Sequence, residues 1–371
     1  MPLSLLLKLR NPWGRFSWKG DWSDASPLWT AQMRAELCPS GNMGSGVFWM
    51  PFDQFRRYFC RVDVCKTRGG EWRERRLAPL PLLLSTGAVS RLRVTQTTEL
   101  DLILYQENHR LQRTDRRHGH LDLLLLVIKE QSGEFVASSR WKIVPFVTLN
   151  GLLSPGSYLL LAVSFNHWRL NLQEMPTGAL AVWSSREVTL EPIPQPPPCI
   201  LADAMLAFVA AKGREMDMDS DGTSSFIPTG VRSFFAPGGF QSGGGRKLIV
   251  RHLMQDGCAG VVLTAENRHH LDSLTLRCDC SGSANVVSTR ATLATHDSLP
   301  PMHRQVLVLL TQLEDTCAWQ VAFRVSCSQT PFGGVLNKLG LNVANMPAHT
   351  PSIEGDHYLN LHAPRPITQT Q

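Results

Sequence analysis

Apolar and polar residues alternate in short segments along most of the chain, and this pattern predicts a protein built mainly of β-strands. At 99–104 three leucines alternate with two acidic residues, as expected of a strand with one buried face. Residues 121–128 (LDLLLLVI) instead predict a strand buried on both faces. A Pro-Gly turn at 155–156 introduces another strand. Short strands separated by turns are typical of a β-sandwich, which we expect over residues 99–192.

The N-terminal segment has a different composition. Residues 1–66 hold five of the ten tryptophans, namely Trp13, Trp18, Trp22, Trp29 and Trp49. The spacing of Phe52, Phe55 and Phe59 predicts a short helix in this segment. We interpret the basic, Leu- and Pro-rich residues 67–98 as a connector. The fold class expected for the chain is therefore mainly β, and α+β overall.

A Pro-rich segment at 191–200 predicts the boundary to a second β-rich domain, which we expect over residues 193–345. Within it, residues 214–246 contain many glycines and little periodicity, so we interpret them as a flexible insertion. The polar, Pro-containing residues 346–371 predict a disordered tail.

Charge and composition narrow the class of protein. The net charge of +6 comes from 37 basic and 31 acidic residues spread along the chain, which does not resemble the clustered basic surface of a nucleic-acid-binding protein. No apolar run approaches the ~18 residues needed to span a bilayer. An odd number of cysteines, nine, and the absence of glycosylation sequons favour the reducing cytoplasm over secretion.

Two local sequence patterns each have a structural and a functional interpretation. Cys278 and Cys280, with two histidines and another cysteine nearby, could bind zinc, but structural zinc usually has paired Cys-x₂-Cys spacing, so we expect plain reduced thiols. The basic loop at 109–120 could contact acidic phospholipid or an acidic partner, although a solvated loop at the end of a sandwich is the simpler interpretation.

The segment KLRNPWGRF (8–16) raises a sharper question, because an apolar strand ends there in Asn-Pro-Trp-Gly. These four residues favour a turn, with Trp13 packed over it. Together with the sequences LRNPWGRFSWKGDWSDASPLW (9–29) and GVFWMPFDQFRRYFCRVDVC (46–65), however, the segment resembles the C-terminal part of the calpain protease core. In that family, a strand ending in Leu-Arg-Asn-Pro-Trp-Gly presents the catalytic asparagine.

Later segments extend the resemblance. LSPGSYLLLAVSF (153–165) is similar to the calpain β-sandwich. CDCSGSANVVSTR (278–290) and DSLPPMHRQVLVLLTQLE (297–314) are similar to the C-terminal region of the small-optic-lobes type of calpain. The resemblance implies an intracellular cysteine endopeptidase that cleaves protein substrates.

The resemblance also implies roles for two residues. A Cys-His-Asn protease needs a thiolate nucleophile, a histidine that holds the proton, and an amide oxygen that orients the imidazole. By the family motif, Asn11 takes the third role, and Trp13 would shield the His–Asn hydrogen bond from water.

The chain departs from the family pattern in two respects. No cysteine or histidine precedes Asn11, and the first histidine is His109, so we expect the chain alone to be inactive without an N-terminal segment carrying Cys and His. We interpret the sequence as a truncated gene model, a partial sequence or a separate C-terminal product. Met1 lies just before a core strand, which favours truncation.

The chain also departs from the family at the calcium-binding positions. At the four positions where the family places acidic calcium ligands, only Asp24 is retained, and the others are Ser17, Ser45 and Val47. We therefore expect no calcium, zinc or other cofactor. The alternative to a protease is a non-catalytic β-sandwich module that binds protein or a membrane surface.

Overall fold

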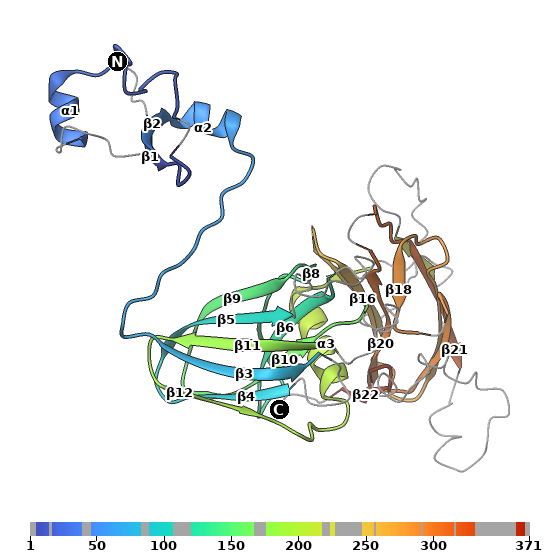
Figure 1. Ribbon diagram of the computed structural model, residues 1–371. Helices are drawn as coiled ribbons and strands as arrows, with labels where there is room; N and C mark the ends of the chain where they lie inside the picture. Colours follow the sequence, from blue (N-terminus) through green and yellow to red (C-terminus); the bar gives the residue numbers. More distant parts are fainter. Residues whose placement is uncertain are drawn as a thin grey trace. The chain divides into compact units, whose positions relative to one another are not determined.

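The computed structural model describes residues 5–14, 17–38, 46–82, 89–106, 120–166, 176–216, 223–226, 247–255, 257–290, 292–314, 317–330 and 361–367. The chain divides into two compact units, residues 1–68 and residues 69–371 (Figure 1). Strands predominate, so the expected mainly β class is confirmed. No helix in the described part of the chain is both long and apolar enough to span a membrane.

The first unit is a two-stranded antiparallel sheet with two short helices. Its elements are β1 (Leu6–Arg10), α1 (Ala31–Leu37), β2 (Val47–Pro51) and α2 (Phe52–Tyr58). Helix α1 begins after Thr30, whose hydroxyl oxygen accepts the Met33 N–H at 3.2 Å. The predicted helix at the three phenylalanines is present as α2, with the Phe55 and Phe59 rings stacked.

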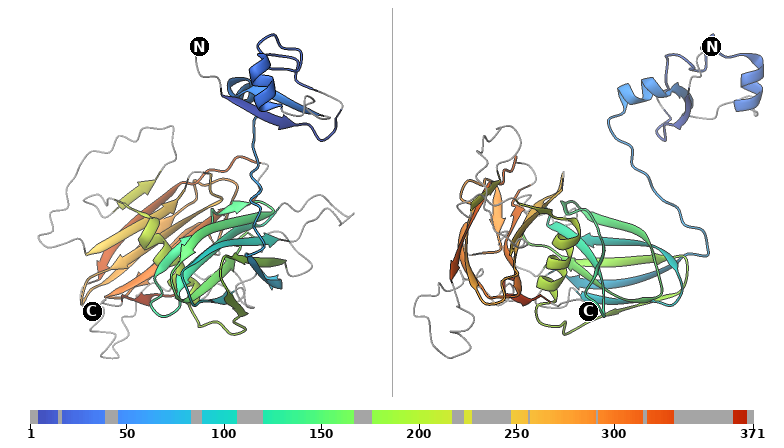
Figure 2. Two further views of the ribbon diagram at one scale, coloured as in Figure 1. Left: turned by 90° about the vertical axis from the view of Figure 1, so that its left-hand side faces the viewer. Right: turned by 180° about the vertical axis from the view of Figure 1, so that it is seen from behind.

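Two β-sandwiches make up the second unit (Figures 1 and 2). The first packs a six-stranded sheet against a four-stranded sheet around one apolar core. The six-stranded sheet has the order β12-β4-β10-β6-β7, with β8 beside β6, from strands β4 (Val89–Val94), β6 (Asp122–Lys129), β7 (Phe135–Ser138), β8 (Lys142–Ile143), β10 (Gly156–Val163) and β12 (Val188–Pro192). The other has the order β3-β11-β5-β9, from β3 (Arg73–Pro81), β5 (Thr98–Gln106), β9 (Phe146–Leu153) and β11 (Thr177–Ser184).

The second sandwich repeats this arrangement with its own core. One sheet has the order β13-β15-β16-β20-β18, with β22 beside β20, from β13 (Arg214–Glu215), β15 (Leu248–Met254), β16 (Gly260–Asn267), β18 (Val286–Ser288), β20 (His303–Gln312) and β22 (Arg365–Pro366). The other has the order β14-β21-β17-β19, from β14 (Thr223–Phe226), β17 (Ser273–Asp279), β19 (Ala294–Leu299) and β21 (Phe323–Thr330).

Helix α3 (Ile200–Lys212) lies between the two sandwiches, as the views of Figures 1 and 2 agree. Its sequence is apolar on nearly every side, a pattern that is stable only when a helix is enclosed. Residues on the helix share a third core with both flanking sheets, including Leu126 of β6 and Val306 of β20. The apolar core therefore continues across the Pro-rich segment where the sequence predicts a domain boundary; the boundaries themselves stay a prediction.

The structure corrects the interpretation of residues 67–98 as a connector, since β3 and β4 lie within this range. Three arginines and two prolines obscure the alternating pattern in β3. Proline is tolerated there because β3 is the end strand of its sheet and needs no ladder partner on one side.

The structure also corrects part of the predicted tail and insertion. In the tail, Leu361 is buried in the core around α3, and β22 pairs with β20. In the insertion, β13 and β14 are strands. The rest of the predicted tail, together with 217–222 and 227–246, lies outside the described residues, as does most of the basic loop at 109–120.

A buried aspartate joins the two sandwiches. Asp122 of β6 accepts five hydrogen bonds, and one of them comes from the Thr311 hydroxyl of β20 at 2.7 Å. Burial raises the pKa of the Asp122 carboxyl, and these hydrogen bonds oppose that effect. The Trp141 indole donates to the same carboxylate at 2.9 Å and lies so close to Gly260 of β16 that a Cβ at Gly260 would be 2.3 Å from the ring.

We predict that Asp122→Asn lowers the free energy of unfolding of the chain by about 3 kcal/mol, because an amide N–H₂ replaces an acceptor oxygen among buried donors. Urea unfolding followed by circular dichroism measures the change. The control Asp279→Asn alters a partly exposed carboxylate that accepts hydrogen bonds from Ser281, and should cost under about 1 kcal/mol. Equal effects of the two substitutions would contradict the prediction.

Candidate functional site

Asn11 lies directly after β1, and the backbone around it is tightly constrained. Its N–H donates to the Gly46 carbonyl oxygen at 2.8 Å, next to the start of β2, and its own carbonyl oxygen accepts the Gly14 N–H at 3.1 Å. Gly46 has φ +77°, and a Cβ there would lie 2.3 Å from the Asn11 carbonyl oxygen. The residue facing Asn11 must therefore be glycine, and the Asn-Pro-Trp-Gly segment forms the turn that its composition favours.

The Asn11 side chain is fixed by the same turn. Its Oδ1 accepts the Trp13 N–H at 3.0 Å, the usual hydrogen bond of an asparagine that begins a turn. An amide oxygen is a hydrogen-bond acceptor, which is the chemistry needed to orient the N–H of an imidazole. The geometry is compatible with the orienting role expected of Asn11, which stays a prediction.

Trp13 does not pack over the turn in this unit. Its side chain is 83% exposed, so the structure contradicts the interpretation of this indole as core. The core of the first unit is formed by Trp29, Phe48, Trp49 and Met50, in which Trp29 packs edge-on against Trp22 and Trp49. Shielding of a His–Asn hydrogen bond by Trp13 stays a prediction for an assembled enzyme.

The first unit leaves much of its apolar surface uncovered. Eight of the twelve large, exposed hydrophobic residues in the described part of the chain belong to it, namely Leu5, Trp13, Leu28, Phe52, Tyr58, Phe59, Val62 and Val64. This unit contributes only residues 1–68, so the excess is pronounced. Exposed apolar surface of this extent is typical of an interaction surface.

Asp24 lies on the surface of the first unit, and its backbone carbonyl oxygen accepts from Arg34 of α1 at 2.6 Å. Ser17 and Val47 are partly buried, whereas Ser45 lies outside the described residues. No group of three or more metal-binding side chains occurs in the described part of the chain, at Asp24 or at the cysteines and histidines considered for zinc.

Comparison with known proteins finds matches in two segments of the chain. Residues 3–66 match the sequence model of the calpain family cysteine proteases, and residues 238–331 match that of the calpain-D-like C-terminal domain. The chain is calpain-like in both segments. The expected resemblance is thereby confirmed.

The matched relatives are much longer than the segments that they share with this chain. Calpain-9 of Homo sapiens is 43% identical over 63 residues, which are 16% of this chain and 9% of calpain-9. Calpain-type cysteine protease DEK1 of Zea mays is 39% identical over 69 residues, 18% of this chain and 3% of DEK1. For the calpain-2 catalytic subunit of Mus musculus the identity is 38% over 66 residues, 17% of this chain and 9% of that protein. The chain thus matches less than a tenth of each.

Among solved structures, vicilin from Solanum lycopersicum aligns with 72% of this chain and 80% of its own, at 8% identity and a TM-score of 0.16. A similarity this low carries no argument about fold or function.

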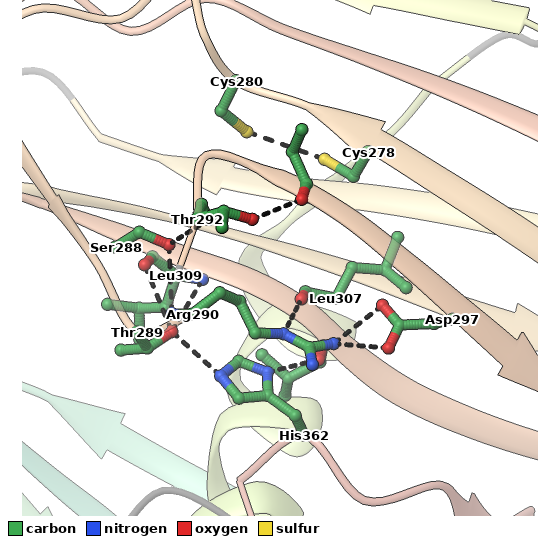
Figure 3. Close-up of polar contacts among 12 residues, drawn as sticks. Cys278, Cys280, Ser288, Thr289, Arg290, Thr292, Asp297, Leu307, Leu309 and His362 are labelled. Atoms are coloured by element: carbon green, nitrogen blue, oxygen red, sulfur yellow. Dashed lines mark hydrogen bonds and ion pairs between the residues drawn. The ribbon is translucent and has the colours of Figure 1, made fainter. Parts of the chain in front are cut away.

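The calpain-D-like segment contains a buried charged cluster that the sequence did not single out (Figure 3). Arg290 donates to both carboxylate oxygens of Asp297 at 2.7 Å and to the Leu307 carbonyl oxygen at 2.9 Å, with both charged side chains almost fully buried. A buried pair of this kind is costly to break, because removing one partner leaves an uncompensated charge.

His362 joins this cluster from the far end of the chain (Figure 3). Its Nδ1 lies 2.8 Å from the Val306 carbonyl oxygen, which can only accept, so Nδ1 carries the proton. Nε2 then accepts from the Thr289 hydroxyl at 2.9 Å. Burial, together with the Arg290 charge, lowers the pKa of His362 to about 3. No pattern in the sequence distinguishes this histidine from the others in the predicted tail.

Cys278 and Cys280 place their sulfur atoms 3.6 Å apart in the core of the second sandwich. The hydrogen bond with Cys280 and burial raise the pKa of the Cys278 thiol well above its usual value, which disfavours the thiolate that binds metals. All nine cysteines lie in the described residues, and none forms a disulfide.

We predict that millimolar Ca²⁺ leaves the melting temperature of the chain unchanged, since a single carboxylate at Asp24 is a poor calcium site. Differential scanning fluorimetry with and without Ca²⁺ measures this, with Mg²⁺ as the control for ionic strength. A rise of several degrees that disappears in Asp24→Ala would show that a calcium site is present.

We also predict that the chain loses stability as the pH falls below about 6.5. His362 binds a proton in the unfolded chain near that pH but only near pH 3 in the folded chain, so protonation favours unfolding throughout this interval. The loss from His362 amounts to at most about 1.4 kcal/mol per pH unit.

Urea unfolding at several pH values measures the slope. His362→Gln should flatten it, whereas His270→Gln, which removes an exposed imidazole, should leave it as in the wild type. The prediction fails if both variants keep the wild-type slope.

Proposed function

We propose that these residues work as the later part of a calpain-type cysteine endopeptidase, in which Asn11 orients the catalytic imidazole. The observation that carries the proposal is the placement of Asn11. In a segment similar to the calpain protease core, its amide follows a strand and is held by a turn, and the facing residue, Gly46, has no room for a Cβ beside the Asn11 carbonyl oxygen.

In the proposed reaction, a cysteine thiolate attacks the carbonyl carbon of a peptide bond in a protein substrate, and a histidine gives its proton to the leaving amine. Asn11 Oδ1 accepts the other ring N–H and so fixes the direction of the imidazole. Asparagine suits this position because its amide oxygen accepts a hydrogen bond without adding a full charge.

The nucleophile and the base have no candidates before Asn11 in the printed sequence, whose first cysteine is Cys38 and first histidine His109. We infer that they come from a segment that precedes Asn11 in chain order in the complete enzyme. The uncovered apolar surface of residues 1–68 supports this, because such a segment would bury it. The 371 residues alone should be inactive.

A second candidate is a non-catalytic β-module that binds protein or a membrane surface. It is favoured by the second unit, residues 69–371, which is compact and contains its own cores. For either function we propose a cytoplasmic location, which the nine reduced thiols support.

We predict that the chain by itself cleaves a fluorogenic peptide at the background rate and that a preceding segment restores cleavage. The segment of a calpain relative that carries its cysteine and histidine would be fused or co-expressed, and thiol-dependent cleavage measured. In the completed enzyme, Asn11→Ala should lower kcat/KM roughly a hundredfold, because it removes an orienting hydrogen bond.

The matched control is Gln32→Ala, which removes an exposed amide from α1 and should leave the rate unchanged. Trp13→Ala should lower the rate of the completed enzyme without changing the melting temperature of the chain, since its indole is exposed there. A folded, completed enzyme that stays inactive, or in which Asn11→Ala has no effect, would refute the protease proposal and favour the binding module.

A further inference from the structure

Strand β9 differs from the other end strands of the sheets in the second unit. Among the described residues, the other end strands are short, carry charged side chains or contain proline, features that prevent a further strand from pairing. Strand β3 has three arginines and two prolines, and β12 ends in Glu191 and Pro192. In contrast, β9 has eight residues, FVTLNGLL, without charge or proline.

The backbone of β9 offers hydrogen-bonding groups on its open side. The Gln106 N–H donates to the Pro145 carbonyl oxygen at 3.1 Å, and β9 pairs with β5 from Phe146 to Leu153. Because the direction of these groups alternates along an antiparallel strand, those of 146, 148, 150 and 152 point away from β5. Within the described part of the chain, β9 has no strand on that side, as the order of the labelled strands in Figure 1 illustrates.

The side chains of these four residues are also exposed and lie on one face of the sheet. The outermost two are large and apolar: Phe146 is 49% exposed and Leu152 is 68% exposed. The two between them, Thr148 and Asn150, are polar and uncharged. Tyr105 of β5 packs against the Phe146 ring at 5.7 Å between centroids and supports it at the end of the strand.

We propose that β9 pairs edge to edge, in antiparallel direction, with β9 of a second copy of this chain. A two-fold axis at Leu149 places Phe146 opposite Leu152 of the second copy and Thr148 opposite its Asn150. The apolar residues then meet apolar residues and the polar residues meet polar ones, twice in each dimer. In this register all four outward-pointing residues find hydrogen-bonding partners, and two four-stranded sheets become one continuous sheet.

The absence of charge favours a second copy as the occupant. A strand that pairs with its own copy across a two-fold axis brings identical charges close together, and β9 has none to repel each other. An end strand evolved for a different, charged partner segment would be expected to carry a complementary charge, which β9 does not. The pattern of β9 complements itself.

Sedimentation velocity of the full chain over a range of concentrations tests the proposal, with a monomer–dimer equilibrium expected. Leu152→Lys should raise the dimer dissociation constant roughly tenfold or more, because it removes both Phe146–Leu152 contacts and adds charge. The new lysine would stand opposite Glu99 of β5, so the monomer should keep its fold.

Thr148→Lys is a second variant at the same edge and should have the same effect. Thr189→Lys, on the exposed surface of end strand β12, is the matched control and should leave the dissociation constant unchanged. Melting curves identify any variant that fails to fold. If one of the two β9 variants does not fold, the dissociation constant of the other decides the test. A chain that is monomeric at all concentrations, or a dimer that both β9 variants leave intact, would overturn the proposal.

Discussion

The buried carboxylate of Asp122 is the interaction on which the second unit depends. An ionised group without water is stable only when donors surround it, and the five donors here come from β6's own sandwich and from Thr311 of the other. The direction of each donor is fixed by the strand or loop that carries it. The carboxylate therefore defines how the two sandwiches meet, whereas apolar contacts alone would allow them to slide.

The apolar core around α3 completes this arrangement. The helix lies between two sheets, and Leu361 closes the same core from a segment far along the chain. Arg365 of that segment also forms a bidentate ion pair with Asp203 of α3, with both distances 2.8 Å. Charge and apolar contacts thus hold the segment at several points, which explains how a polar sequence becomes ordered structure.

The sequence predicts the features that depend on local pattern. The β-strands at 99–192, the helix at the three phenylalanines and the turn at Asn11 all follow from periodicity or turn chemistry, and the calpain resemblance follows from dense motifs in residues 5–65. The features that the sequence does not predict depend on contacts between residues that lie far apart in the chain. Strand β3 becomes recognisable as a strand through its pairing with β11. Burial, followed by the Arg290 charge, lowers the pKa of His362, whose Nδ1 bonds the Val306 carbonyl oxygen 56 positions earlier in the chain. No local pattern encodes such contacts.

The position of His362 has a consequence for biosynthesis. The core that its neighbour Leu361 helps to close includes Val89 and Leu124, which leave the ribosome much earlier. Until residue 362 has been synthesised, part of that apolar surface and the buried Arg290 environment remain open to water. The second unit therefore reaches its final form only after this segment has been translated, and partly built multi-strand units with exposed apolar surface are the kind of species that aggregates during folding.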